Sequence, residues 1–376
     1  MLKINLVKDL ISIPSQIDID NEKEISKYLC KILKEKGFNI EMYEFLKDRP
    51  NIIANYKFEK NGPTIIFNGH MDTVKYYNGQ SKEEWNTNPS EATIIDDKVY
   101  GRGACDMKGG IASALSAIFH CIDNNSGCGN IVVNLVSDEE NTGLYGTLPI
   151  CENNLLTGDI AIVMEPTENT VCNKQLGNMF FKTSIKGIGG HTGISEGKIN
   201  PFDISYSYIE KLREWIITKR KNQFDNQPFI NIGNYNGGTS SGTIPSECEL
   251  YWGTRVMPED NFVDYMKEVL EITSDFQTTL PKNCEIKTVL FEGGGIDSFE
   301  CHSEIINNII KISEKEKGIF TASSDAGFIN NILNIPTIVF GPGSLKQAHV
   351  SNEYISIEEM EKYSNMIYEF LTSLGE

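Results

Sequence analysis

The sequence is short of several features that mark whole classes of protein. It contains no apolar run of about 20 residues, so no membrane-spanning helix is expected. Residues 1–16 mix Leu and Ile with Lys and Asp and lack the unbroken apolar core of a signal peptide. The nine cysteines include no CxxC pair, which favours reduced thiols over a disulfide framework. We therefore expect a cytoplasmic protein without a membrane partner.

Positive charge is also scarce. Among 376 residues, 34 Lys and Arg stand against 52 Asp and Glu, which gives a formal net charge of -18. Such a chain repels phosphate backbones, so nucleic acid is a poor partner. The same acidity suits a site that gathers carboxylates around a cation. A hydrophobic content of 40% is enough for a full core, and disorder is not expected.

What the sequence does contain is an alternation of helical and strand patterns. Residues 21–38 carry apolar side chains at helical spacing, and Gly37 is a typical stop signal. Short apolar runs at 51–56, 64–69 and 130–136 read as strands. Alternating strands and helices predict an α/β fold with a mixed, largely parallel sheet flanked by helices.

The pattern changes near Lys174. From there to about Gly293 the order is strand, helix, strand, strand, helix, strand, which predicts a ferredoxin-like α+β sandwich. The βα character returns afterwards. We therefore expect one domain made of residues 1–174 and 294–376, interrupted by a second domain at 175–293.

Several apolar strands end in potential metal ligands, and a late loop adds another. These residues are His70, Asp72, Asp106, Asp138, Glu139, Glu140, Glu165 and His349. Each one alone has a plain structural alternative, such as a hydrogen-bonded core histidine or an acid at a helix start. Together they would repel one another unless cations compensate their charge. Imidazole with carboxylate suits Zn²⁺, Co²⁺ or Mn²⁺, and the absence of Cys ligands argues against a purely structural zinc site.

The motifs that contain these residues resemble those of the M20 metallopeptidase family. That family includes acetylornithine deacetylase, succinyl-diaminopimelate desuccinylase, aminoacylase and glutamate carboxypeptidases. The resemblance covers essentially the whole chain and implies a di-zinc peptidase fold. Its motifs, in order, are GHMDTV, GRGACDMKGG, SDEE, MEP, GIGGHTG, GTRVMP and FGPGSLKQAHVSNE.

The resemblance implies two adjacent divalent metal ions, with Zn²⁺ preferred to Co²⁺ or Mn²⁺. His70 and Glu165 would hold one ion, Glu140 and His349 the other, and Asp106 would bridge them. It also implies that Asp72 accepts the second ring N–H of His70, and that the peptide bond after Asp106 is cis.

The resemblance further implies the catalytic groups. Glu139 would be the general base for a metal-activated water, and His191 of the inserted domain would stabilise the oxyanion. Arg255 would hold the substrate carboxylate, and Gly327 would line the substrate pocket. The inserted domain would serve as a lid and dimerisation domain, so a homodimer is expected.

The sequence leaves more than one class of substrate open. Deacylases and carboxypeptidases of the family tend to carry Glu at the position of Glu165, which favours a small N-acyl amino acid over a free-amine peptide. The alternatives are a di- or carboxypeptidase acting on short peptides, and a non-catalytic relative that binds a small ligand. One departure bears on this choice, because Gly242 stands where the family often has Asn.

Overall fold

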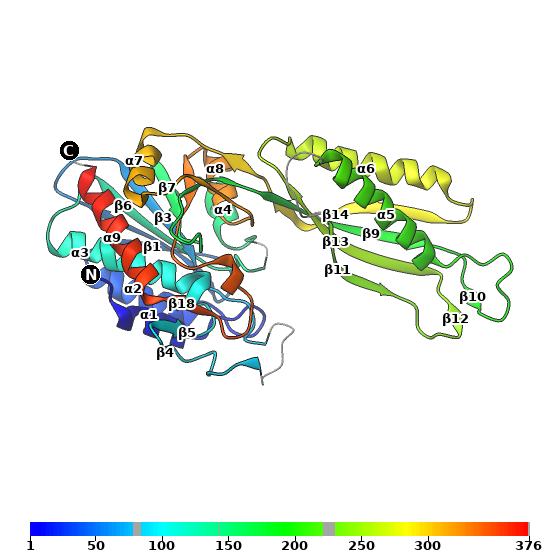
Figure 1. Cartoon of the computed structure of the whole chain (residues 1–376), viewed down its shortest axis with the longest axis horizontal. Helices are drawn as coiled ribbons and strands as arrows, with labels where there is room; N and C mark the ends of the chain where they lie inside the picture. The colour runs from blue at the N-terminus through cyan, green and yellow to red at the C-terminus, as the bar shows by residue number, and fades with distance from the viewer. Residues whose placement is uncertain (78–83, 142, 221–229, 375–376) are drawn as a thin grey trace. The chain divides into compact units, whose positions relative to one another are not determined.

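The computed structural model describes residues 1–77, 84–141, 143–220 and 230–374 (Figure 1). The chain divides into two compact units: Met1–Gln175 with Phe299–Glu376, and Leu176–Ser298. The second unit is thus inserted between β8 (Cys172–Gln175) and β15 (Phe299–Glu300) of the first. Phe229, where we expect one strand to begin, lies outside the described residues.

The first unit is built on a mixed sheet. Across the sheet, the described strands are β1 (Asn39–Leu46), β2 (Arg49–Lys57), β6 (Asn130–Val136), β3 (Thr64–His70), β7 (Ile160–Val163), β17 (Thr337–Val339), β8 and β15, and β16 (Gly318–Phe320) pairs with β8. The central strands β6, β3, β7 and β17 are parallel to their neighbours in this series, whereas β1, β2 and β15 pair antiparallel. The predicted α/β class, with a sheet that is parallel at its centre, is confirmed.

Helices cover this sheet on both faces. Consecutive residues of β3, β6 and β7 are buried, which requires cover on each side. The helices of the unit are α1 (Ile4–Ser12), α2 (Lys23–Glu35), α3 (Gly109–Asp123), α4 (Thr147–Glu152), α7 (Glu304–Ser313), α8 (Ala326–Leu333) and α9 (Ile357–Ser373). Helix α3 packs against α1 and α9, and α4 packs against α8. Within the described ranges, no helix combines the length and apolar character that a membrane span needs.

Local sequence explains how two of these helices are placed. In α2, Ile25, Leu29 and Leu33 form the buried face, and Gly37 follows the helix with φ 88°, a conformation that glycine adopts without strain. In α3, a Cβ on Gly110 would lie 2.3 Å from the carbonyl oxygen of Met164. Only glycine therefore lets the start of α3 approach the residue that precedes Glu165.

A small antiparallel sheet lies beside α3. It consists of β18 (Tyr354–Ser356), β5 (Lys98–Tyr100) and β4 (Thr93–Ile95). Strand β5 leads into the turn Ala104–Lys108 (η2), which contains the expected cis peptide bond between Asp106 and Met107. The pairing of β18 with β5 places the segment after His349 next to the segment before Asp106.

The inserted unit has the predicted β-α-β-β-α-β order. Its main elements are β9 (Gly177–Lys186), α5 (Pro201–Lys219), β11 (Ile230–Gly237), β13 (Glu247–Val256), α6 (Phe262–Thr279) and β14 (Glu285–Ile296). The strands form an antiparallel sheet in the order β11-β13-β9-β14. Two short strands, β10 (Gly190–His191) and β12 (Thr243–Ile244), pair separately.

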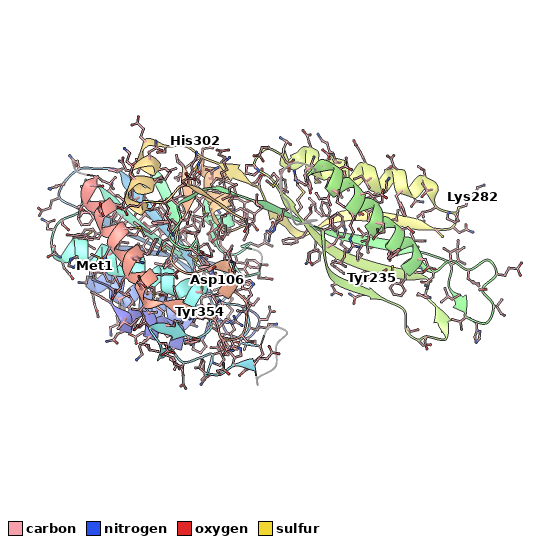
Figure 2. All side chains as sticks on the ribbon, in the orientation of Figure 1. Met1, Asp106, Tyr235, Lys282, His302 and Tyr354 are labelled. Atoms are coloured by element: carbon pink, nitrogen blue, oxygen red, sulfur yellow. The ribbon has the colours of Figure 1, made fainter. Side chains whose placement is uncertain are left out.

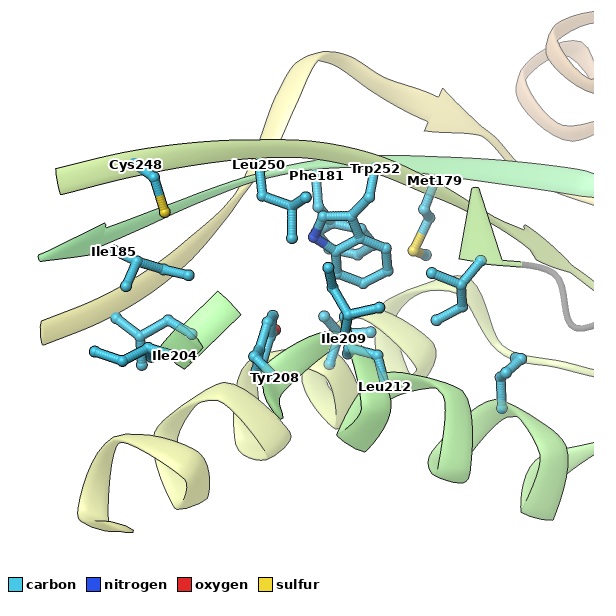
Figure 3. Close-up of a cluster of buried hydrophobic side chains, with 14 of the residues drawn as sticks. Met179, Phe181, Ile185, Ile204, Tyr208, Ile209, Leu212, Cys248, Leu250 and Trp252 are labelled. Carbon is cyan, nitrogen blue, oxygen red and sulfur yellow. The ribbon is translucent and has the colours of Figure 1, made fainter. Parts of the chain in front are cut away.

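The core of this unit lies between the sheet and its two helices (Figure 3). Residues of β13 alternate between buried and more exposed, as expected for a strand with one covered face. Phe181 of β9 stacks on Trp252 of β13 with ring centroids 4.6 Å apart. Helix α5 contributes Tyr208 and Leu212 to the same cluster. The role of this unit as a lid stays a prediction.

Candidate metal centre

Four of the five predicted ligands and the predicted base Glu139 lie at one end of the first unit's sheet. Strand β3 ends at His70, and the segments that follow β6 and β7 carry Glu139, Glu140 and Glu165. Because β6, β3 and β7 are adjacent and parallel, their carboxyl ends meet at one edge of the sheet. Asp106, labelled in Figure 2, is contributed by the turn that precedes α3.

Asp106 stands between the two predicted ligand histidines. Its Oδ1 lies 3.0 Å from Nε2 of His70, and its Oδ2 lies 3.4 Å from Nε2 of His349. Nε2 of His70 is also 3.7 Å from Oε1 of Glu165, whereas Nε2 of His349 is 2.8 Å from Oε2 of Glu140. The ligands thus fall into two sets that share one carboxylate. Oε2 of Glu139 lies 4.0 Å from Nε2 of His70.

These residues fit divalent cations in both chemistry and spacing. Two triads, His70 with Glu139 and Glu165, and His70 with Asp106 and Glu140, each have ligand atoms within 4.8 Å of one another. Among the residues that the structure describes, Oε1 of Glu140 is a buried oxygen without a hydrogen-bond partner. A buried carboxylate oxygen in that state is costly unless a cation or a proton reaches it.

The electrostatics of the cluster point the same way. Burial raises the pKa values of Glu139 and Glu165 well above the ordinary range, and neighbouring acids add to this effect. Burial opposes the charged form of His70, but Asp106, Glu139 and Glu165 outweigh it and raise the His70 pKa. Hydrogen bonds to Asp106 and Glu140 raise the pKa of His349 to about 10. Divalent ions in this position would offset the same repulsion among the carboxylates.

The structure corrects the role expected of Asp72. Nδ1 of His70 lies 2.9 Å from the main-chain carbonyl oxygen of Asp72 and 3.7 Å from its carboxylate. The carboxylate instead accepts hydrogen bonds from the backbone N–H groups of Glu139 (3.3 Å) and Glu140 (3.0 Å). Asp72 therefore orients His70 through its backbone, and its side chain holds the segment that carries Glu139 and Glu140.

Comparison with known proteins decides the family. The model of peptidase family M20/M25/M40 matches residues 66–373, which is most of the chain. The chain belongs to this family. Succinyl-diaminopimelate desuccinylase of Rickettsia akari (strain Hartford) is 30% identical over 394 residues, covering 99% of each chain. Acetylornithine deacetylase of Yersinia pseudotuberculosis (strain IP 31758) is 28% identical and covers 80% of this chain and 76% of its own.

A solved structure supports the fold. An M20 family metallo-carboxypeptidase from Sulfolobus solfataricus superposes with a TM-score of 0.79 at 18% identity, covering 99% of this chain and 98% of its own. The expected M20 resemblance is confirmed by the family match, and so is the class of the enzyme, a metal-dependent hydrolase of carbon–nitrogen bonds.

The remaining site residues of this M20 chain lie in other places. Gly327 is buried in α8 of the first unit, and its N–H donates to the carbonyl oxygen of Ser324. His191 and Arg255 belong to the inserted unit. His191 is exposed on β10, where its Nδ1 accepts from the N–H of Gly193 at 3.0 Å. Arg255 lies on β13 opposite Asn178, and burial lowers its pKa.

Sequence reasoning missed the contacts that hold the residue before Glu139 in place. Arg49, at the start of β2, donates through Nη1 to Asp138 at 2.7 Å and through Nε and Nη2 to Glu22 at 3.0 and 2.6 Å. Asp138 has φ 68° and immediately precedes Glu139. An arginine and an acid about 90 positions apart carry no local signal of this contact, so no sequence pattern could have found it.

A second missed acid is Asp325, in the segment that begins α8. It is 1% exposed, and its Oδ2 accepts from the Thr147 hydroxyl at 2.7 Å. Its Oδ1 is a buried oxygen with no hydrogen-bond partner among the described residues. After burial, the negative charge of Asp325 is among the causes that raise the pKa of Glu139.

Proposed function

We propose that the protein is a two-metal amidohydrolase that cleaves a small N-acyl amino acid. The observation that supports this most strongly is the position of Asp106, with one carboxylate oxygen toward His70 and the other toward His349. A carboxylate in that position is suited to bridge two cations. Divalent metals in such a site act as Lewis acids and lower the pKa of a bound water.

The proposed ligands form one set for each metal ion. His70 and Glu165 would hold one ion, Glu140 and His349 the other, and Asp106 would contact both. Zn²⁺ is the preferred ion by ligand type, with Co²⁺ and Mn²⁺ as alternatives. Asp72 keeps the Glu139–Glu140 segment in register with His70 through its carboxylate and its carbonyl.

Glu139 is the proposed proton carrier. Its side chain is 14% exposed and its Oε2 lies 4.0 Å from Nε2 of His70, so it is close enough to the predicted ligands to reach a water bound there. Its raised pKa suits a group that takes a proton from water and returns it to the leaving nitrogen. From the inserted unit, His191 would donate to the oxyanion and Arg255 would bind the substrate carboxylate as a two-pronged donor.

The choice of substrate rests on the relatives and on one residue. The two curated relatives are a desuccinylase and a deacetylase, both of which remove an acyl group. Glu165 agrees with that class. A carboxypeptidase acting on short peptides is the second candidate, favoured by the fold neighbour from Sulfolobus solfataricus. The proposal also includes a homodimer in the cytoplasm, and both of these stay predictions.

A matched pair of variants tests the proposal. Glu139→Gln is expected to lower kcat by on the order of 10²–10⁴ while two metal ions per chain are retained. Glu152→Gln, an exposed glutamate at the end of α4, is the control and should leave kcat unchanged. The substrates are N-acetyl, N-succinyl and N-formyl amino acids together with dipeptides, each assayed with Zn²⁺, Co²⁺ and Mn²⁺. Wild-type turnover by Glu139→Gln would remove Glu139 from the mechanism, and binding without cleavage of every compound would favour a non-catalytic relative.

A further inference from the structure

A buried carboxylate outside the ligand set holds the turn that carries Asp106. Glu353 is 1% exposed, and both its oxygens accept from that turn's backbone. Oε1 accepts from the N–H groups of Cys105 (2.8 Å) and Asp106 (3.1 Å), and Oε2 accepts from the N–H of Gly103 (3.0 Å). Three backbone donors converging on one side chain determine the path of the chain into Asp106.

Arg102 ties the same carboxylate to the loop that carries His349. The guanidinium is 1% exposed, and its Nη1 donates to Oε2 of Glu353 at 2.9 Å and to the carbonyl oxygen of Val350 at 3.1 Å. Val350 directly follows His349. The ring of Trp85 lies over the guanidinium, 5.1 Å from its carbon, and helps to shield the pair from water. The N–H of Gly101 adds a bond to the carbonyl oxygen of Glu353 at 3.1 Å.

Such a pair is a poor way to gain stability alone. Burying two charges costs several kcal/mol of hydration for each ion, and well-packed apolar residues often do as well or better. What the pair does supply is geometry, because Nη1 of Arg102 bonds to Glu353 and to the carbonyl oxygen of Val350, while the Glu353 carboxylate bonds to three backbone N–H groups. The arrangement joins two loops, and each loop carries a proposed ligand.

The two ligand sets differ in how much the positions of their side chains depend on this contact between the loops. His70 ends β3, which is paired with β6 on one side and β7 on the other, and Glu165 closely follows β7. His349 lies in a loop outside the named elements, and its side chain is 49% exposed. His70 and Glu165 are therefore held by the sheet, whereas the position of His349 relative to the shared Asp106 depends on the loop contacts.

We propose that Arg102 and Glu353 are positioning residues for the metal ion held by Asp106, Glu140 and His349. The ion held by His70, Asp106 and Glu165 depends on them much less. The inference rests on the proposed function, since it presumes two ions in the cluster. It makes Glu353 a residue that acts through Asp106 and His349 without touching metal or substrate.

The test is metal binding measured directly. Glu353→Gln keeps the size of the side chain but replaces one accepting oxygen with an NH2 group. This donor then faces a backbone N–H or the guanidinium of Arg102. Metal-free protein is titrated with Co²⁺, and binding is followed by calorimetry and by the visible absorption of the bound ion. The expected result is an unchanged first site and a second dissociation constant weakened by about 10–100-fold, with loss of the absorption component that belongs to the second ion.

Two further variants keep the outcome interpretable. Arg102→Lys keeps the charge but not the fork, so a smaller weakening of the second site alone is expected; this variant carries the test if Glu353→Gln does not fold. Asp260→Asn is the matched control, since Asp260 pairs with the buried Arg220 in the inserted unit. It should lower the melting temperature without changing either metal site.

The outcomes separate the two proposals. If wild-type protein binds two ions and Glu353→Gln binds both with unchanged affinity, the positioning role is wrong. Equal weakening of both sites would also overturn it, because the pair would then support the whole cluster. If wild-type protein binds no ion, the proposed function itself fails, whatever the variant does.

Discussion

The two units bury polar groups in opposite ways. Between the sheet and the helices of the inserted unit, neutral hydroxyls meet: those of Thr183 and Thr288 lie 2.9 Å apart, and Tyr208 bonds to Thr273 at 2.7 Å and to Thr288 at 3.1 Å. A hydroxyl both donates and accepts, so the chain of bonds can run from Trp252, which donates to Thr183, to Thr273, which donates to the carbonyl oxygen of Val269. The first unit instead gathers acids around His70 and His349. A network of neutral hydroxyls satisfies its own hydrogen bonds, whereas crowded carboxylates repel one another unless cations compensate their charge.

The largest expected effect is on the free energy of unfolding, when an aromatic side chain is removed from the core of the inserted unit. Phe181→Ala removes one partner of the stack on Trp252 and should lower the free energy of unfolding by about 3–5 kcal/mol. Phe180→Ala, the adjacent residue on the opposite face of β9, is 43% exposed and should change it by less than about 1 kcal/mol. Urea unfolding measures both. Equal losses would mean that the two faces of this sheet are not distinguished as described.

The next prediction tests whether the inserted unit contributes to catalysis without binding the metal ions. His191→Ala should lower kcat by on the order of 10²–10³, because a donor to the oxyanion is lost, while metal content stays at two ions per chain. His302→Ala, an exposed histidine of the first unit, is the control and should leave kcat unchanged. Steady-state kinetics with metal analysis by mass spectrometry checks this. A loss of metal in His191→Ala would place His191 among the ligands instead.

The smallest effect concerns a buried acid of the first unit. Burial raises the pKa of Asp325 to about 6 from an ordinary value of 3.8. Between those two pH values the folded protein keeps a proton that the unfolded chain has released. The contribution of Asp325 to stability therefore falls as pH rises through this window and is level above it.

Asp325→Asn removes that fall, so metal-free variant protein should gain up to about 3 kcal/mol relative to wild type between the lower and upper ends of the window. Urea unfolding at several pH values measures the difference. Asp275→Asn, an exposed residue of α6, is the control and should run parallel to wild type. A wild-type-like pH profile for Asp325→Asn would show that Asp325 is ionised in the folded protein without cost.

Local pattern was enough for much of the fold. The apolar runs that became β3, β6 and β7 are too short for helices and too continuous for exposed strands, and the switch of pattern after Lys174 marks the inserted unit. Candidate ligands followed from the histidines and acids at strand ends, and the resemblance to the M20 family suggested their roles. Each of these signals lies within a few residues, because strand period, helix period and turn preference are local properties of the chain.

The hydrogen-bond partners could not be read in this way. Local spacing suggested the carboxylate of Asp72 for His70, but the carbonyl oxygen is the acceptor and the carboxylate serves the backbone of Glu139 and Glu140. Spacing along the chain gives the side of the strand on which Asp72 lies. It does not say whether the side chain or the main chain is nearer, because that depends on how the strand bends at its end.

By itself, the sequence indicated the family and the α/β class with its insertion, and it supplied the candidate ligands, whose roles stay predictions. Only the tertiary structure decided how those residues are held: Asp138 by Arg49, and the turn before Asp106 by Glu353, which lies 247 positions along the chain. The physical reason is that buried charges choose partners by distance in space and by desolvation. Neither quantity exists until the sheet has brought its strand ends together.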